Sequence, residues 1–173
     1  LTCYGCSAFD LPQETGVLLF QDNFDLPSSG WDRYHDDRYS SDYYSGSYRI
    51  EVNQPNYEAW AVPGLEFSAV LIDVSAKKIS GPDNNVFGII SRYNKPNDFF
   101  FFLISSDGYA GIGIYQKGKQ TLLSGGNMLP ADPINTGSVS NKIHVECVGD
   151  TLSLSVNDVI LYEVRSAALQ SGD

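Results

Sequence analysis

The sequence predicts an all-β protein, an antiparallel β-sandwich with jelly-roll connections. Three observations predict this fold. Residues 84–118 read as three β-strands joined by two turns, in the order of an antiparallel meander. Tyr and Phe occur 11 and 9 times while charged residues make up 18% of the chain, a composition typical of strands. Turn-forming residues recur roughly every eight to twelve residues, the spacing of a sandwich or jelly roll.

The meander gives the clearest strands. Residues 99–104 are apolar on both alternating faces, so we expect this strand to be covered on both sides. Asp107 and Gly108 predict a hairpin, because a type I′ turn needs positive φ and Gly adopts it readily. In residues 109–115 one face is apolar, whereas the other carries two tyrosines that flank two glycines.

Shorter alternating segments predict the other strands, for a total of about ten and no convincing helix. These strands are expected at residues 17–20, 48–52, 57–62, 69–74, 121–123, 142–147, 152–156 and 159–164. Residues 21–30 and 125–140 are rich in turn formers and predict loops, while residues 31–46 are crowded with Tyr, Asp and Ser. Residues 167–170 predict one short helical turn.

Length and charge limit the possible classes of protein. The chain of 173 residues suits a single domain, residues 17–173, that follows an N-terminal tail of residues 1–16. The net charge of −10 argues against a nucleic-acid partner, because phosphate binding needs clustered Lys and Arg. No apolar run approaches the ~18 residues of a membrane-spanning helix, so we expect no membrane span.

The three cysteines are Cys3, Cys6 and Cys147. No nearby Cys or His completes a zinc site with the Cys3-x-x-Cys6 pair, and no helix start follows it as in redox motifs. We therefore expect a local disulfide or an anchoring role for this pair. Because the number of cysteines is odd, one thiol should be free or paired between chains.

Aromatic side chains are the candidates for ligand binding, because Trp and Tyr rings stack on the apolar faces of sugars. The candidate ligand-binding residues are Trp60, Tyr109, Tyr115, Trp31 and Tyr43. Trp60 alternates with the charged Glu58, which favours its exposure. Gly111 and Gly113 would let a ligand approach the backbone closely. The competing interpretation is that these rings pack the sandwich or its loops, as aromatics do in β proteins.

Two loops carry oxygen ligands suited to Ca²⁺. The candidate metal ligands are Asp22, Asp25, Asp83 and Asn84, and a calcium ion held there would be structural. The alternative is that these residues serve their turns, because Asp and Asn side chains bond to nearby backbone groups.

Five segments together resemble a known family. They are LLFQDNFDLPSSGWD (18–32), YYSGSYRIEVNQPN (43–56), GPDNNVFGIISRY (81–93), DFFFFLISSDGYAGI (98–112) and NKIHVECVGDTLSLSVNDVILYEV (141–164). The chain resembles bacterial extracytoplasmic domains of the concanavalin A-like lectin/glucanase type, with a LamG-like jelly roll. The resemblance implies this sandwich over residues 17–173 and a secreted or cell-surface protein. It leaves the function open, because the fold hosts lectins, hydrolases and structural modules.

Three departures from the family pattern have consequences. Ser91 stands where the family often has Cys, so a bridge to Cys147 is not available. Asp158 stands where a hairpin Gly is usual. The family pattern continues beyond Asp173 into two further strands, and a jelly roll without them has an open sheet edge that invites a partner strand.

Hydrolase chemistry lacks its motif in this chain. Hydrolases of this fold carry a Glu-x-Asp-x-x-Glu strand, which holds two carboxyl groups ~5 Å apart for a retaining mechanism. The glutamates here are scattered singly. His35 and His144 have no spaced Ser or Cys partner that suggests a catalytic triad, so we expect both at the surface.

The sequence therefore predicts a non-catalytic carbohydrate-binding or adhesion module whose partner is a glycan. A second hypothesis is a structural subunit of an extracellular or envelope assembly. Such a subunit would exchange strands with other copies or envelope proteins through its N-terminal tail or its open C-terminal edge. A third hypothesis is a glycoside hydrolase, which two carboxylates facing one cleft would favour.

Overall fold

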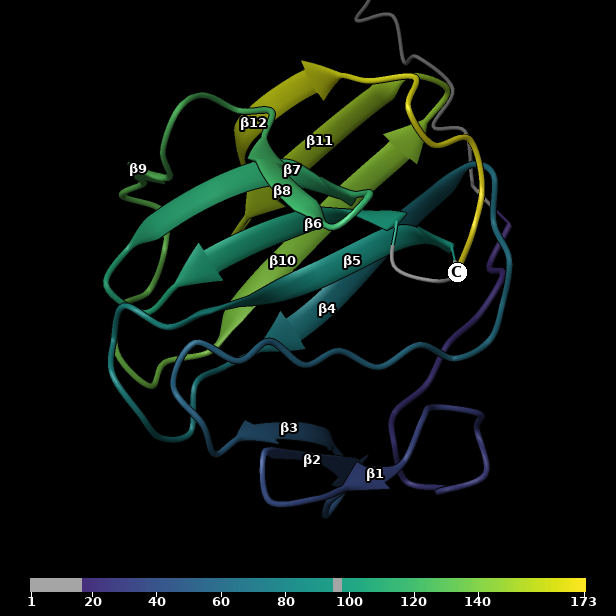
Figure 1. The fold of residues 1–173 in the computed structure, drawn as a ribbon, viewed down its shortest axis with the longest axis vertical. Helices are drawn as coiled ribbons and strands as arrows, with labels where there is room; N and C mark the ends of the chain where they lie inside the picture. The colour runs from purple at the N-terminus through teal and green to yellow at the C-terminus, as the bar shows by residue number, and fades with distance from the viewer. Residues whose placement is uncertain (1–16, 95–97) are drawn as a thin grey trace, which may run out of the picture.

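The fold is a sandwich of two antiparallel β-sheets with a small third sheet at one end (Figure 1). The structure is a computed structural model that describes residues 17–94 and 98–173. The first large sheet, here the β10 sheet, contains β4 (Val70–Ala76), β10 (Asn141–Val148), β11 (Thr151–Val156) and β12 (Val159–Arg165). Its strand order is β12-β11-β10-β4.

The second large sheet, here the β6 sheet, has the order β5-β6-β7-β8, and β9 pairs with β7. Its strands are β5 (Val86–Asn94), β6 (Asp98–Ser105), β7 (Tyr109–Gln116), β8 (Lys119–Leu122) and β9 (Leu129–Pro130). The all-β sandwich predicted from the sequence is confirmed.

The core lies between the two large sheets and consists of the inward positions of their strands. The side chains that are 0% exposed there include Phe100, Phe102, Ile104, Ala110, Ile112, Ile143, Val145, Leu152, Leu154 and Val156. Burying a large apolar side chain contributes roughly 1.5–3 kcal/mol, so this alternation holds the sheets together. The expectation that residues 99–104 are covered on both faces is confirmed, because Phe99 and Phe101 on the outer side are only 5% and 3% exposed.

The third sheet forms a separate aromatic lobe. It contains β1 (Tyr34–His35), β2 (Tyr39–Tyr43) and β3 (Tyr48–Val52) in that order. Trp31 packs between Phe24 and Tyr48, at ring-centroid distances of 5.7 and 5.4 Å. In Figure 1 this lobe lies below the sandwich, at the opposite end of the molecule from β12.

Arg92 ties three distant segments together inside the fold. It is 1% exposed and lies at a positive φ of 54° near the end of β5. Its guanidinium donates to the backbone oxygens of Ser68 (2.9 Å), Gly149 (3.0 Å) and Leu169 (2.8 Å). These bonds fix the segment that follows β12 against β5, where Gly172 also bridges to Phe67.

Several predicted elements differ from the structure. Residues 17–20 and 57–62 alternate like strands but pair with no neighbour, and residues 167–170 form no helical turn. Conversely β2 lies within the stretch crowded with Tyr, Asp and Ser. The β6–β7 hairpin is confirmed, but its turn is not type I′, because Gly108 has a positive φ of 93° and Asp107 does not. The hairpin loop instead ends on a left-handed glycine, the usual solution for three-residue loops.

The structure shows how the chain accommodates two departures from the family pattern, Ser91 in place of Cys and Asp158 in place of a hairpin Gly. Cys147 is free and 0% exposed, and its thiol contacts the Ser91 hydroxyl on the facing sheet. Burial raises the pKa of this thiol, although the Ser91 hydroxyl acts in the opposite direction. A link between chains through Cys147 is therefore not available to the folded protein. Asn157 and Asp158 both have positive φ, 51° and 66°, as a type I′ hairpin requires.

Cys3, Cys6 and the N-terminal tail lie outside the described residues. Within the described part of the chain, no helix has the length and apolar character needed to cross a membrane.

Candidate functional site

The outer face of the β10 sheet carries short polar side chains along β11, which we infer to form the floor of a shallow groove. Ser153 and Ser155 point outward, because Leu152, Leu154 and Val156 fill the core. Despite facing outward, the two serines are only 7% and 8% exposed. Their side chains are short and lie between strands with longer ones, so they form the floor of a groove. We call this feature the serine groove.

The walls of the serine groove follow from the register of the strands. Ser153 lies opposite Glu146 of β10 and Glu163 of β12. Ser155 lies opposite His144 of β10 and Ile160 of β12. Neighbouring strands are ~4.8 Å apart, so side chains in such a row can contact one ligand together.

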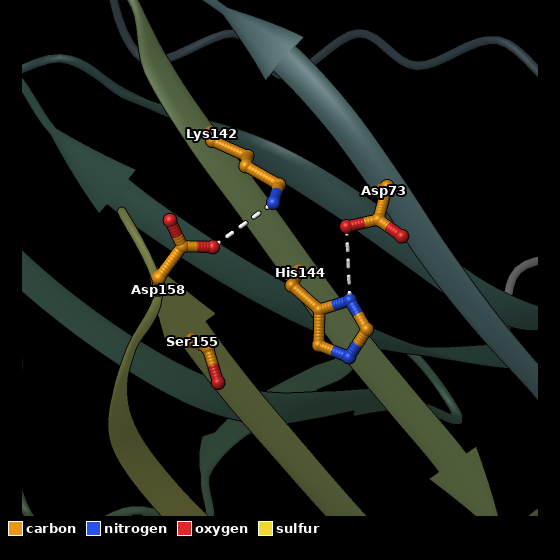
Figure 2. A pocket seen from close by; sticks show the side chains of 5 residues that line it. All are labelled: Asp73, Lys142, His144, Ser155 and Asp158. Atoms are coloured by element: carbon orange, nitrogen blue, oxygen red, sulfur yellow. Dashed lines mark hydrogen bonds and ion pairs between the residues drawn. The ribbon is translucent and has the colours of Figure 1, made fainter. Parts of the chain in front are cut away.

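At its Ser155 end the groove opens into a hollow of about 370 Å³ lined by Asp73, Lys142, His144, Ser155 and Asp158. Figure 2 shows these side chains rising from the sheet, with Asp73 on β4 beside His144 on β10. The Lys142 ammonium donates to Asp158 at 2.9 Å. Acceptors, donors and a hydroxyl thus converge on one open space.

Neither floor hydroxyl has a hydrogen-bond partner among the side chains or turns of the described residues. Neither hydroxyl is among the fully buried polar atoms that lack a partner, so both reach solvent through the open side of the groove, where a ligand can replace water. The hydroxyls of Ser153 and Ser155 are therefore available to form hydrogen bonds with a ligand in the groove. This is the strongest sign of a ligand site in the described part of the chain.

His144 is held between two carboxylates. Its Nδ1 lies 3.0 Å from Asp73 Oδ1, and its Nε2 lies 3.2 Å from Glu146 Oε1. Partial burial lowers the pKa of His144, but the hydrogen bonds to Asp73 and Glu146 outweigh it and raise the pKa above its ordinary value. As an imidazolium, His144 donates to both carboxylates at once.

The row Asp73, His144 and Ser155 contains the residue types of a catalytic triad, which the sequence spacing did not reveal. A triad needs the second imidazole nitrogen to bond to the serine hydroxyl and take its proton. Here that nitrogen contacts Glu146 instead. The row therefore lacks the hydrogen bond between imidazole and serine that a catalytic triad uses.

The predicted aromatic residues divide into two groups. Trp60 and Tyr115 lie on either side of Phe99, at ring-centroid distances of 5.2 and 5.3 Å. All three are on the outer face of the β6 sheet, away from the serine groove. Tyr109, which is 39% exposed, lies at the other end of β7 beside Pro130.

Trp31 and Tyr43 belong to the aromatic lobe. The Tyr43 hydroxyl accepts from the backbone N–H of Trp31 at 3.1 Å and contacts the Ser29 hydroxyl at 2.8 Å. Both side chains are half-buried and take part in packing the lobe. The structure therefore brings Trp60 and Tyr115 together but leaves Trp31, Tyr43 and Tyr109 elsewhere.

The two glycines of β7 make room for protein side chains and not for a ligand. A Cβ at Gly113 would come within 2.1 Å of the Phe101 ring, and one at Gly111 within 3.1 Å of Met128. The expectation that a ligand approaches the backbone here is wrong, because Phe101 and Met128 already occupy that space.

The predicted metal ligands make hydrogen bonds and ion pairs within their loops. Asp22 accepts from the backbone N–H of Phe24 at 2.8 Å, and Asp25 accepts from the Asn23 side chain at 2.6 Å. Asp83 pairs with Lys78, and Asn84 follows it in the same turn. Within residues 17–94 and 98–173, no group of three or more His, Cys, Asp or Glu side chains could hold a metal ion. Calcium binding through Asp22, Asp25, Asp83 and Asn84 stays a prediction.

Comparison with known proteins adds two similar structures. No family model matches the sequence, and no curated protein matches it. The fold is similar to that of the carbohydrate-binding module CBM66 from Bacillus subtilis, with a TM-score of 0.56, 11% identity, and coverage of 83% of this chain and 84% of that one. Sheep galectin-11 in complex with glycerol has a TM-score of 0.47 and 13% identity, over 62% of this chain and 77% of that one. At these identities the likeness concerns the fold, and the LamG-like assignment stays a prediction.

Proposed function

We propose that this protein is a non-catalytic, extracytoplasmic carbohydrate-binding module that holds a glycan in the serine groove. One observation carries the proposal: Ser153 and Ser155 are residues more than nine-tenths buried, yet they face outward, and their hydroxyls have no hydrogen-bond partner among the described side chains and stay open to a ligand. A glycan presents many hydroxyls, each of which can donate and accept. It therefore suits a groove that offers hydroxyl, carboxylate, ammonium and imidazole groups side by side.

The fold likeness to a solved carbohydrate-binding module supports the same proposal. The extracytoplasmic location rests on the family resemblance of residues 17–173.

The proposal is tested by screening the protein on a glycan array and then measuring affinity for the best neutral oligosaccharide by calorimetry. Ser153→Phe should abolish binding, because the ring would fill the groove floor. Thr121→Phe places the same ring on the exposed edge strand β8 of the other sheet and should leave the affinity within about twofold. Binding that survives Ser153→Phe but is lost in Trp60→Ala and Tyr115→Ala would move the site to the β6 sheet and contradict the proposal.

A second candidate function is a glycoside hydrolase. Glu146 and Glu163 both face the groove, one on each side of Ser153. Inverting enzymes hold two carboxyl groups roughly 6.5–9.5 Å apart, and two strand spacings give a similar separation. A general acid must be free to donate a proton to the leaving oxygen, however, and Glu146 Oε1 already contacts His144 Nε2 at 3.2 Å. Release of reducing ends from an oligosaccharide that binds, abolished in Glu163→Gln, would establish hydrolysis and overturn the non-catalytic proposal.

A further inference from the structure

The charges around the serine groove are unevenly distributed. Four carboxylates face it, whereas the cationic side chains are one ammonium and one imidazole. Asp73 and Asp158 line the hollow together with the cationic groups Lys142 and His144, and the strand register places the other two carboxylates, Glu146 and Glu163, on either side of Ser153. The groove is therefore net negative whether or not the imidazole is protonated.

The two cations are already bound by carboxylates of the groove. Lys142 pairs with Asp158, and His144 contacts Asp73 and Glu146. Arg165, the cationic residue at the end of β12, pairs with Asp150 at 3.0 Å. An acidic ligand would have to displace one of these carboxylates and would face the others at short range, so the groove disfavours anions.

Glu163 differs from the other carboxylates, because it is exposed and has no ion-pair or hydrogen-bond partner among the described side chains. It lies directly across from the unpartnered Ser153 hydroxyl. A ligand ammonium beside Ser153 could bond to Glu163 without breaking any existing ion pair. On the other side of Ser153, the carboxylate of Glu146 is 46% exposed and adds attraction.

We infer that the serine groove selects glycans that carry free amino groups, such as oligomers of an unacetylated amino sugar, and rejects acidic glycans. This inference rests on the proposed function, since it names the ligand class of the same groove. Glu163 bonds to the ammonium of the ligand, because it has no ion-pair partner among the described side chains, and Asp158 adds to the negative charge of the groove. Ser153 and Ser155 bond to the hydroxyls of the ligand. One favourable charge contact of this kind corresponds to about tenfold in affinity.

The test compares three probes by calorimetry in low salt at a pH at which the amine is protonated. They are a glucosamine tetramer, the N-acetylated tetramer of the same length and linkage, and a uronic acid tetramer. We expect the amine form to bind about tenfold more tightly than the acetylated form and the uronic acid form not to bind. The tenfold preference should shrink in 0.5 M salt, because the ions screen this partly exposed site.

Three variants separate the groove from the overall charge of the chain. Glu163→Gln and Asp158→Asn should each reduce the preference for the amine to about threefold or less while leaving the acetylated form unchanged. Glu58→Gln removes one negative charge from an exposed loop and should leave the preference intact. Three results would overturn this inference but leave the proposed function standing. They are equal affinity for the amine and acetylated probes, tighter binding of the acidic probe, and a preference that falls equally in all three variants. If none of the probes and no neutral glycan binds, the proposed function fails with it.

Discussion

His144 links the groove to pH because both of its ring nitrogens face carboxylates. The groups around it are Asp73 on β4, Lys142 and Glu146 on β10, and Asp158 in the β11–β12 turn. The pKa of His144 is higher in the folded protein than in the unfolded chain. The folded protein therefore binds the proton on this ring more tightly. The resulting stabilisation is fully present below the unfolded pKa of about 6.5 and is lost as the pH rises through the folded value.

We therefore predict that His144→Gln lowers the free energy of unfolding by about 1 kcal/mol at pH 5, because the two hydrogen bonds that it removes go to partly exposed carboxylates that solvent screens. At pH 8.5 the same substitution should have a much smaller effect. Urea unfolding at both pH values measures this difference. His35→Gln is the matched control, because His35 is exposed on β1. An effect of His144→Gln that is equal at both pH values would contradict the role of the imidazolium.

Arg92 is the other residue whose environment has a clear energetic consequence. Its charge is buried, and its guanidinium donates to the carbonyl oxygens of Ser68, Gly149 and Leu169. Hydrogen bonds from a charged donor contribute about 1.5–3 kcal/mol each, and unpaired buried carbonyls are costly. This side chain therefore stabilises the packing of residues 166–173 more than any surface ion pair can.

Replacing Arg92 by Met keeps the apolar stem but removes all three bonds. We predict that Arg92→Met lowers the free energy of unfolding by about 3 kcal/mol or more. Arg33→Met removes an exposed ion pair with Asp42 and should cost less than about 1 kcal/mol. Urea unfolding measures both variants. Equal decreases in the free energy of unfolding would show that the buried hydrogen bonds of Arg92 stabilise the protein no more than an exposed ion pair does.

At the scale of elements, β7 packs so closely against the Phe101 ring that one methyl group is too many. We predict that Gly113→Ala lowers the free energy of unfolding by about 1–3 kcal/mol, because its Cβ would lie 2.1 Å from Phe101 Cζ. Gly126→Ala is the matched control, since nothing lies within 4 Å of a Cβ at that position. Thermal unfolding of both variants tests this, and an unchanged melting temperature for Gly113→Ala would contradict the packing.

The sandwich strands were predictable because their alternation is local. In β10 and β11 every second residue is apolar, so the inward side of each strand can be read from the sequence. The serine groove could not be read in the same way. It depends on the register between β4, β10 and β11, which brings Asp73, His144 and Ser155 together from distant parts of the chain. The outward hydroxyls of Ser153 and Ser155 were the one local signal.

Residues 57–62 show that a local pattern can also predict a strand that does not form. They alternate between small and larger side chains, yet they form a connection in which Trp60 packs on Phe99. The driving force is burial of the indole ring against the β6 sheet, and this competes successfully with strand pairing. In β2, tyrosine stacking supports a strand that the polar composition had hidden: Tyr39 stacks on Tyr34 at 4.4 Å.

At the scale of the whole molecule, the two large sheets offer different outer surfaces. The β10 sheet presents charged and hydroxyl groups around a groove, whereas the β6 sheet carries the half-buried rings of Trp60 and Tyr115 over the buried ring of Phe99. The aromatic lobe lies at one end, apart from both (Figure 1). The protein therefore offers a glycan two candidate binding faces, and the proposed function assigns the glycan to the outer face of the β10 sheet.

The most direct test of this choice is NMR chemical-shift mapping with the neutral oligosaccharide that binds best on the array. We expect the largest changes at the Ser153 and Ser155 amides and at the His144 imidazole. Changes confined to Trp60, Phe99 and Tyr115, or no changes at saturating glycan, would contradict it.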